Sequence, residues 1–293
     1  MILVAGATGL VGRQVCRQLA AAKQPVRALV RATADVAKVE ELKGCGAILV
    51  AGDLKDRASL DAACLGVSTV ITTASTTLSR QPDDSIQTVD QEGQRRLIDA
   101  AVGAGARRFV YVSFSHHIDV ACPLTTAKRT VERHLEQSGL TYTILAPTFF
   151  MEVWLGPALG FDIKNGKAQV FGSGKNAISW ISLADVAQFA VMCVEHPKAS
   201  NTTIELGGPE ALAPLDVVRA CEEVCGRSFE VQQVPEDVLR AQRAAATDPF
   251  QQTFTALMLA YATGDRIDMR STLRTFPVPL VSVKQYARQV LAS

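Results

Sequence analysis

Short apolar runs alternate with longer amphipathic segments through the first half of the chain. The apolar runs, bounded by turn residues, predict buried strands, and the segments between them have helical periodicity. Such alternation is typical of a parallel sheet with helices on both faces. The predicted strands are residues 2–5, 26–30, 47–50, 69–73, 109–113 and 142–145. The predicted helices are residues 10–23, 58–64, 89–103 and 128–138.

The pattern changes after Pro147, where glycine-punctuated segments replace the regular alternation. Ser182, with Asp185 three residues later, predicts a capped helix over residues 186–195. Further helices are expected after Pro214 and Pro235, at 250–261 and at 282–291, with short strands at 203–206 and 230–234. We therefore expect an α/β protein with a Rossmann-type doubly wound parallel sheet over residues 1–150. A smaller, mostly helical substrate-binding lobe is expected over residues 151–293, some segments of which return to the core.

Composition narrows the class of protein further. The 293 residues are 48% hydrophobic and 20% charged, which is typical of a globular protein with a large core. A net charge of +1 favours neither nucleic acid nor an anionic membrane as a partner. The seven cysteines include no C-x-x-C pair, so we expect reduced, mostly buried thiols and no metal site. The chain has no secretory signal pattern and no apolar run of about 18 residues, which predicts a cytoplasmic protein.

A glycine-rich turn follows the first predicted strand. Glycine in such a turn lets backbone N–H groups approach a pyrophosphate closely, and the following helix N-terminus favours the phosphate charge. The segment comprises Gly6, Ala7, Thr8, Gly9, Leu10, Val11 and Gly12. Its position at the first strand–helix turn predicts a dinucleotide site, with a ligand-free turn as the alternative.

Arg31 ends the second predicted strand, where an acidic residue would bind the ribose of NAD and a cation accommodates the 2′-phosphate of NADP. Its guanidinium is a planar, permanently charged fork for phosphate, which Arg27 or Lys38 would assist. The alternative is a solvated surface arginine. We expect NADP(H) to be the cofactor.

The G-x-x-G-x-x-G spacing resembles that of extended and atypical short-chain dehydrogenases, and the chain is similar to the NmrA-like family among them. The resemblance spans most of the chain. It rests on the glycine turn and on Gly52-Asp53-Leu54, Ser113, Lys128, residues 146–152 and Gly207-Gly208-Pro209. The family includes NADP-dependent reductases and redox-sensing proteins without known turnover.

The resemblance implies further cofactor contacts. A residue in the position of Asp53 accepts a hydrogen bond from the adenine amine in similar proteins, and Leu54 covers the ring; a turn-capping role is the alternative for Asp53. Thr73, Ala74 and Ser75 follow the fourth predicted strand and would line the path of the linker and ribose. Residues 147–152 pack on the nicotinamide and begin the substrate wall in similar proteins.

Short-chain dehydrogenases use a Tyr-x-x-x-Lys pair, in which tyrosine exchanges the proton and lysine lowers its pKa and holds the nicotinamide ribose. Lys128 matches the lysine, with a helical surface residue as the alternative, but Leu124 stands four residues earlier. Leucine cannot exchange a proton, so the usual mechanism is not available from this pair. Thr125 and Thr126 have hydroxyls of far too high a pKa to replace the tyrosine.

The segment after the fifth predicted strand offers other polar groups. Ser113 matches the family's active-site serine, which would orient a substrate carbonyl; capping of backbone is the alternative. His116 and His117 follow at the carboxyl edge of the sheet, where open α/β folds bind ligands. A histidine exchanges protons at neutral pH, so either one is a candidate proton donor, against a solvated loop pair.

Apolar side chains after the sixth predicted strand form a candidate binding surface. Pro147, Thr148 and Phe149 are expected against the cofactor, and Phe150, Met151 and Trp154 against an apolar substrate. The alternative is a hinge core between the two lobes.

Three functions remain open from the sequence. The first is an NADPH-dependent reductase of a small, rather apolar carbonyl, quinone or conjugated substrate, with hydride from the nicotinamide. The second is an NADP(H)-binding redox-sensing regulator of a protein partner, which Leu124 favours. The third is an assembly factor for which the dinucleotide is structural. Fold alone does not separate them.

Overall fold

Strand β1 (Ile2–Ala5) lies inside a seven-stranded sheet in a computed structural model that describes residues 1–78 and 81–293. The strand order is β3-β2-β1-β4-β5-β6-β9. β1 pairs in parallel with β2 on one side and β4 on the other, so the order reverses between β1 and β4. The carboxyl ends of strands at such a reversal are where open α/β sheets bind ligands. The other strands are β2 (Val26–Val30), β3 (Ile48–Ala51), β4 (Thr69–Thr72), β5 (Arg108–Val112), β6 (Thr141–Pro147) and β9 (Thr202–Leu206).

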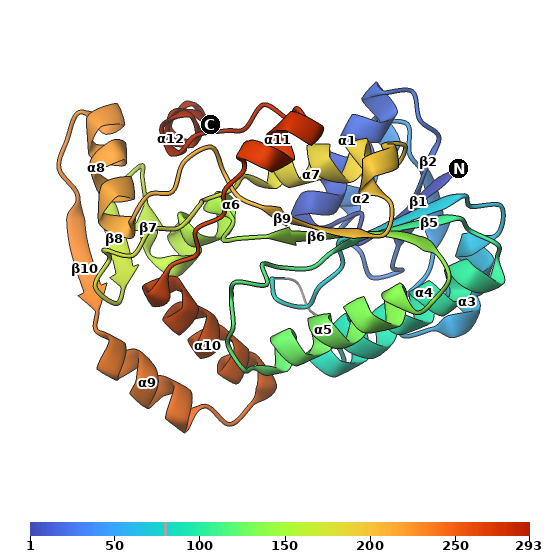
Figure 1. The fold of residues 1–293 in the computed structure, drawn as a ribbon, viewed down its shortest axis with the longest axis horizontal. Coiled ribbons are helices and arrows are strands. Elements are labelled where there is room, and N and C mark those ends of the chain that lie inside the picture. The colour runs from blue at the N-terminus through green and yellow to red at the C-terminus, as the bar shows by residue number, and fades with distance from the viewer. Residues whose placement is uncertain (79–80) are drawn as a thin grey trace. The chain divides into compact units, whose positions relative to one another are not determined.

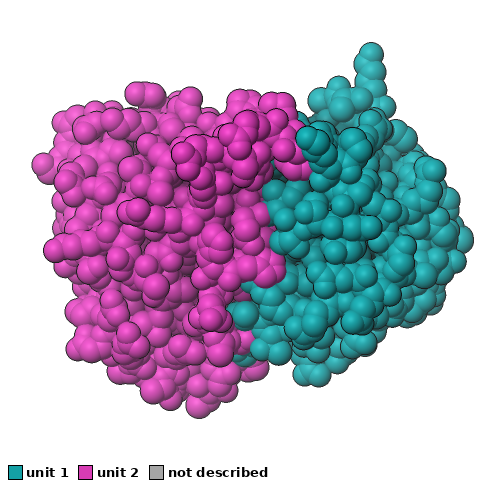
Figure 2. Space-filling model, in the orientation of Figure 1, with its two compact units in different colours: residues 1–113, 123–145, 186–204 teal, residues 114–122, 146–185, 205–293 magenta. Residues whose placement is uncertain are grey.

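The chain divides into two compact units, which Figure 2 colours separately. Unit 1 comprises residues 1–113, 123–145 and 186–204, and unit 2 comprises residues 114–122, 146–185 and 205–293. The sequence predicts a boundary near residue 150 with later segments returning to the core. In the structure, residues 186–204 belong to unit 1 although they follow residue 150, and residues 114–122 belong to unit 2 although they precede it.

Helices cover both faces of the sheet in unit 1 (Figure 1). One face has α1 (Leu10–Ala21), α2 (Val36–Gly44) and the unit 1 part of α7 (Leu183–Met192). The other has α3 (Arg57–Cys64), α4 (Gln94–Gly103) and α5 (Pro123–Glu136). A π-helical turn, η1 (Ile86–Gly93), leads into α4, and a 3₁₀ turn, η3 (Pro197–Ala199), precedes β9. The predicted doubly wound α/β fold is confirmed.

Burial explains why these segments form strands and helices. Every residue of β1 and β4 is buried, as expected for strands covered on both faces. Helix α1 buries Val11, Val15 and Leu19, which recur on one face every four residues. Edge strand β3 is less covered, and Ile48 is 55% exposed there.

The structure differs from the sequence prediction at several elements. The helix predicted to begin at residue 186 begins at Leu183, because Ser182 accepts the N–H of Asp185 and so caps the helix directly before Leu183. Helix α2 was not expected. It buries only Leu42, so its apolar periodicity is weak, and Asp35 caps it by accepting the N–H of Lys38.

Unit 2 contains a small sheet in the order β10-β8-β7, with β10 parallel and β7 antiparallel to β8. Its strands are β7 (Phe161–Asp162), β8 (Lys167–Phe171) and β10 (Glu230–Val234), of which the sequence predicts β10. Its helices are α6 (Met151–Trp154), η2 (Pro157–Leu159), α8 (Pro214–Cys225), α9 (Glu236–Ala245), α10 (Pro249–Thr263), α11 (Arg270–Thr275) and α12 (Val283–Ala292). No helix within the described residues is both long and apolar enough to cross a bilayer.

Candidate functional site

The glycine turn of unit 1 is tightly built. Gly6 has φ +75°, and a Cβ there would lie 2.6 Å from the backbone nitrogen of Ala74. A Cβ on Gly12 would lie 2.1 Å from the carbonyl oxygen of Gly6. Both positions therefore require glycine, one for conformation and close approach, the other for packing of α1 against the turn.

The N-terminus of α1 faces no capping side chain. Gly9 is the N-cap, no side chain of the described residues caps it, and the first turn has no acidic residue. Leu10 is 41% exposed at this end. Backbone N–H groups at an uncapped helix start suit a phosphate, because the helix dipole and the orphan donors act together.

The segment after β4, predicted to line the path of the cofactor's linker and ribose, lies against this turn. The hydroxyl of Thr73 donates to the carbonyl oxygens of Ala5 and Gly6 at 3.4 Å. The carbonyl of Ala74 accepts a hydrogen bond from Gln94 at 2.8 Å. The hydroxyl of Ser75 is 3.2 Å from that of Thr77. Thr73 and Ala74 are thus fixed beside the phosphate-binding candidate.

Arg31 pairs with an acidic residue, Asp84, that the sequence alone does not reveal. Its guanidinium lies 2.6 Å from Oδ2 of Asp84, a carboxylate with 1% of its side chain exposed. Lys55 forms a hydrogen bond to the other oxygen of Asp84 and lies 3.6 Å from Asp53. Arg27, considered above as an assistant, instead donates to the carbonyls of residues 63 and 65. Lys55 is therefore the second cation beside Arg31.

Hydrogen bonds within this cluster shift the pKa values of Asp84 and Lys55 toward their charged forms. Burial acts to raise the pKa of Asp84, but its hydrogen bonds with Lys55, Gln81 and Arg31 outweigh burial and lower it. The pKa of Lys55 is raised, because its hydrogen bonds with Asp84 and Asp83 outweigh its own desolvation. Asp84 and Lys55 are therefore both held in their charged forms.

Asp53 and Leu54 have local structural partners. Asp53 accepts the backbone N–H of Lys55 at 2.8 Å, and its side chain remains one-third exposed. Leu54 is 7% exposed and packs in the hydrophobic core of unit 1. Asp53 therefore keeps an accessible oxygen, whereas Leu54 has a core contact of its own.

Lys128 is buried in α5, not solvated on the helix surface. Its Nζ donates to the carbonyl of Val112 at 3.0 Å and lies 4.9 Å from the ring centre of Tyr111. Burial lowers its pKa, opposed by the charges of Asp90 and Glu132. Asp90 comes from the π-helical turn η1 and accepts hydrogen bonds from the backbone and hydroxyl of Thr76. π-Helical turns often occur at functional sites.

Ser113 and Leu124 are also buried in unit 1, each 5% exposed. The Ser113 hydroxyl donates to Glu132, which Arg129 holds at 2.6 Å. The Ser113 hydroxyl thus already donates to a buried carboxylate. Its role in orienting a substrate carbonyl stays a prediction. Leu124 lies on the same helix as Lys128 and supplies no polar group.

The two adjacent histidines lie in unit 2 and have different carboxylate partners. Nδ1 of His116 is 2.6 Å from Glu205. Nδ1 of His117 is 3.3 Å from Asp265, whose side chain is completely buried while that of His117 is half exposed. Neither oxygen of Asp265 has a hydrogen-bond partner among the described residues. No local sequence signal points to Asp265, because it lies 148 residues from His117.

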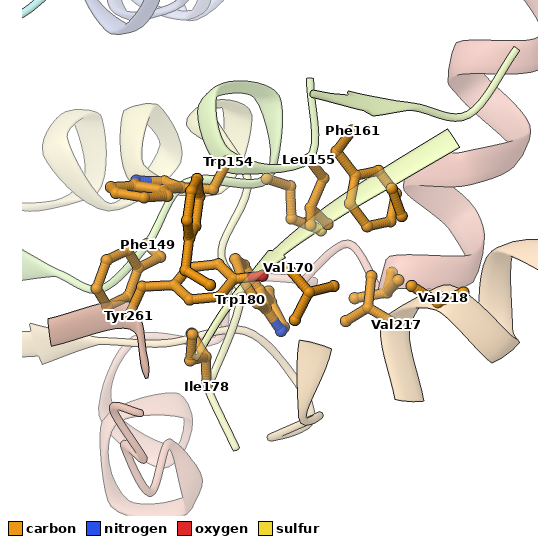
Figure 3. Close-up of a cluster of buried hydrophobic side chains, with 14 of the residues drawn as sticks. Phe149, Trp154, Leu155, Phe161, Val170, Ile178, Trp180, Val217, Val218 and Tyr261 are labelled. Atoms are coloured by element: carbon orange, nitrogen blue, oxygen red, sulfur yellow. The ribbon is translucent and has the colours of Figure 1, made fainter. Parts of the chain in front are cut away.

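The apolar residues after β6 pack mainly within the core of unit 2. The ring of Phe149 is 4.9 Å from Trp154 and 6.0 Å from Tyr261, and Figure 3 shows the three rings together with Trp180. Phe149, Met151 and Trp154 are at most 8% exposed, whereas Phe150 is only partly buried. Most of this set therefore builds the core, and Phe150 retains accessible surface.

Pro147 and Thr148 connect the strand to this cluster. Both are buried, and the N–H of Thr148 donates to the carbonyl of Leu206 at 2.9 Å. The hydroxyl of Thr148 has no hydrogen-bond partner among the described residues. A buried hydroxyl without a partner is uncommon, which keeps Thr148 a candidate ligand-binding residue.

Within the described part of the chain, no group of three or more His, Cys, Asp or Glu side chains is placed to hold a metal ion. The candidate groups for chemistry are the phosphate-binding turn, the Arg31–Lys55 cations, buried Lys128 and the two histidines.

Comparisons with known proteins agree on one family. The model of the NmrA-like family matches residues 1–270. The photosystem II assembly factor Ycf39 of Synechocystis is 34% identical over 87% of this chain and 76% of its own length. An NAD(P)H azoreductase of Xenophilus azovorans is 34% identical over 78% of this chain and 74% of its own length.

Solved structures share the fold. The NADPH-dependent quinone oxidoreductase QOR2 of Escherichia coli, complexed with NADPH, superposes with a TM-score of 0.80 at 21% identity. The match covers 99% of this chain and all of that one. AtPrR2 with NADP⁺ and pinoresinol gives a TM-score of 0.81 at 20% identity over 98% of this chain and 97% of its own.

Proposed function

Since this chain belongs to the NmrA-like family, we propose that it is an NADPH-dependent oxidoreductase that reduces a small, rather apolar carbonyl, quinone or conjugated substrate. The azoreductase relative is named for NAD(P)H, and the QOR2 structure contains NADPH. Those names describe the relatives. For this chain, the proposal depends on whether its own residues suit the cofactor.

The glycine turn suits the pyrophosphate. A side chain at Gly6 or Gly12 would overlap backbone, and the N-terminus of α1 has neither a capping side chain among the described residues nor an acidic residue in its first turn. Binding of a negatively charged group is therefore favourable at this helix N-terminus. Gly9 through Gly12 would supply the N–H donors, and Thr73 and Ala74 would border the pyrophosphate.

The cations at the ends of β2 and β3 suit a 2′-phosphate. Arg31 binds one carboxylate oxygen of Asp84 and Lys55 binds the other, so the two cations together already hold a compact anion. NAD lacks the phosphate, and an acidic residue suited to its ribose is missing at position 31. This convergence of two cations carries the proposal of NADP(H) over NAD(H).

Bound nicotinamide would supply the hydride, and the chain would then have to supply a proton. His117 is the better candidate donor, because its imidazole is half exposed and is held beside a buried carboxylate. His116 is the second candidate, with Glu205 as its partner. Lys128 would hold the nicotinamide ribose, and Phe150 offers accessible apolar surface for the substrate.

Titration and turnover assays test this function. Purified protein is titrated with NADPH and NADH by calorimetry, and NADPH oxidation is then followed with a panel of quinones, aldehydes and azo dyes. We expect tighter binding of NADPH and turnover with at least one acceptor. Absence of NADPH binding would refute the proposal.

Binding without turnover is the second candidate function. Leu124 is buried, and the resemblance to short-chain dehydrogenases places it where their proton-exchanging tyrosine would stand. The Synechocystis relative at 34% identity is named as an assembly factor. A regulator that senses NADP(H) and an assembly scaffold both fit that observation. Tight NADPH binding with no turnover against the panel would favour this class, and very slow cofactor exchange would favour the scaffold.

A further inference from the structure

Asp84 is a buried carboxylate held by two cations from neighbouring strands. It lies in unit 1, two residues before the π-helical turn η1, and 1% of its side chain is exposed. Arg31 follows β2 and lies 2.6 Å from Oδ2, while Lys55 follows β3 and binds Oδ1. The backbone N–H of Gln81 also donates to Oδ2 at 2.8 Å. Asp84 thus occupies the space on which both cations converge.

The two cations remain partly accessible while Asp84 does not. The side chains of Arg31 and Lys55 are 27% and 21% exposed. Lys55 also has Asp83 at 3.2 Å and Asp53 at 3.6 Å, so three carboxylates surround its ammonium. An incoming anion can reach both cations, and it meets negative charge beside them.

We infer that Asp84 competes with the 2′-phosphate of NADP(H) for Arg31 and Lys55 and thereby sets the preference between NADP(H) and NAD(H). The inference rests on the proposed function, because it assumes that this turn and these cations bind a dinucleotide. A phosphate monoester has a charge of about −1.5 to −2 at neutral pH and three acceptor oxygens, against one charge and two oxygens for a carboxylate. The phosphate therefore displaces Asp84 from the cations. Because the contacts of Asp84 must break first, NADPH binds less tightly than it would without Asp84.

NADH has no group that replaces Asp84. Its ribose hydroxyl is neutral and does not compete for a guanidinium and an ammonium that a carboxylate already binds. Binding of NADH therefore leaves the Arg31–Asp84–Lys55 cluster intact. Removal of the Asp84 charge should strengthen the binding of ligands with a 2′-phosphate only.

Calorimetric titration of the full chain tests the competition. Wild type and Asp84→Asn are titrated with NADPH, NADH, 2′-AMP and 5′-AMP. Asparagine keeps an acceptor for the Gln81 N–H but has no charge. We expect Asp84→Asn to bind NADPH and 2′-AMP about tenfold more tightly, the effect of releasing one charge-assisted contact. NADH and 5′-AMP should change by no more than about twofold.

Asp83→Asn is the matched control, because it removes a charge 3.2 Å from Lys55 at a side chain that is 73% exposed. Its effect on 2′-AMP should stay within about twofold, since exposed ion pairs contribute little. A second readout needs no variant: NADPH, and not NADH, should speed hydrogen exchange of the Gln81 amide in wild type. That readout also holds if Asp84→Asn does not fold.

The outcomes distinguish failure of the Asp84 competition from failure of the proposed function. Weaker NADPH binding by Asp84→Asn, with NADH unchanged, would overturn the competition and make Asp84 a group that orients Arg31. Equal changes for both cofactors, or unchanged exchange of Gln81 with NADPH, would overturn it too. Failure of wild type to bind either cofactor would instead refute the proposed function.

Discussion

Nδ1 of His117 lies 3.3 Å from Oδ1 of Asp265, and the two side chains differ completely in exposure: half of His117 is accessible and none of Asp265 is. Both carboxylate oxygens lack a hydrogen-bond partner among the described residues. A buried carboxylate is costly without a cationic or donor partner. Asp265 is therefore placed to orient the imidazole of His117, whose exposed side faces away from the buried carboxylate.

His117→Gln should lower kcat for the acceptor that the enzyme reduces by about 100-fold, because general acid catalysis contributes about 10²- to 10⁴-fold. The Kd of NADPH should not change. Steady-state kinetics and calorimetry check the two parts. His134→Gln is the control. His134 lies on α5 and also pairs with a carboxylate, that of Asp99, at 2.6 Å. Equal kcat for His117→Gln and wild type would transfer the proton-donor role to His116.

Asp265→Asn tests positioning, not contact with substrate. The variant should lower kcat by roughly tenfold, with KM within about twofold of wild type, because the imidazole loses its orienting charge while the binding surface stays intact. The pH profile of kcat should also move, which a structural defect alone would not cause. An unchanged pH profile together with a raised KM would contradict a positioning role.

Arg31→Gln should raise the Kd of NADPH by roughly 10- to 100-fold, the effect of losing a charged hydrogen bond of about 1.5–3 kcal/mol. The Kd of NADH should change little, because its ribose has no phosphate for Arg31 to bind. Calorimetric titration of both cofactors measures the ratio. Arg57→Gln removes another arginine of unit 1 whose partner is the exposed Asp61, and it should leave both Kd values unchanged. Equal losses for the two cofactors would remove the basis for choosing NADP(H).

Gly12→Ala should destabilise the protein and weaken NADPH and NADH alike. A Cβ at this position would lie 2.1 Å from the carbonyl oxygen of Gly6, which is backbone and can move only if the turn opens. Overpacking of this kind costs about 1–3 kcal/mol. Urea denaturation and calorimetry measure the two effects.

Gly103→Ala is the control for that substitution. Gly103 ends α4, and a Cβ there meets nothing within 4 Å. We expect this variant to be as stable as wild type or more stable by about 0.4–1 kcal/mol, since alanine restricts the unfolded chain. If Gly12→Ala matched Gly103→Ala in stability and cofactor affinity, the close-approach argument would be wrong.

The parts of the fold with strong local signals could be predicted from the sequence. The strands at 26–30 and 230–234 agree with β2 and β10 to the residue. Strand β8 was missed because its five residues lie between Gly166 and Gly172, which indicated only turns. Helix α2 was missed because it buries a single side chain. Segments stabilised mainly by neighbours far along the chain have no periodicity of their own to detect.

The same distinction holds for the candidate site. The glycine turn and Arg31 are recognisable because their chemistry depends on position relative to one strand end. Asp84 lies 53 residues from Arg31, and only the fold brings the two together. Burial of Lys128 was likewise invisible, because α5 shows an ordinary mixture of apolar and charged positions.

Glu152 should make stability depend on pH in a direction unusual for a carboxylate. Burial raises its pKa to about 7, opposed by hydrogen bonds that include one from the N–H of Leu183 at 3.1 Å, while the charge of Asp185 adds to the increase. The folded state therefore binds a proton that the unfolded state has released above its ordinary pKa of 4.5. Since the folded state binds more protons between these two values, the free energy of unfolding falls as pH rises from about 4.5 to about 7.

Glu152→Gln removes that dependence, because the amide has no proton to lose. Urea denaturation of wild type and variant at several pH values should show the wild type losing up to about 3 kcal/mol more than the variant across this window. Glu136→Gln changes an exposed glutamate of α5 and should follow the wild-type curve. Parallel curves for wild type and Glu152→Gln would mean that Glu152 is ionised in the folded protein throughout the range. Its contact with Leu183 would then outweigh the effect of burial.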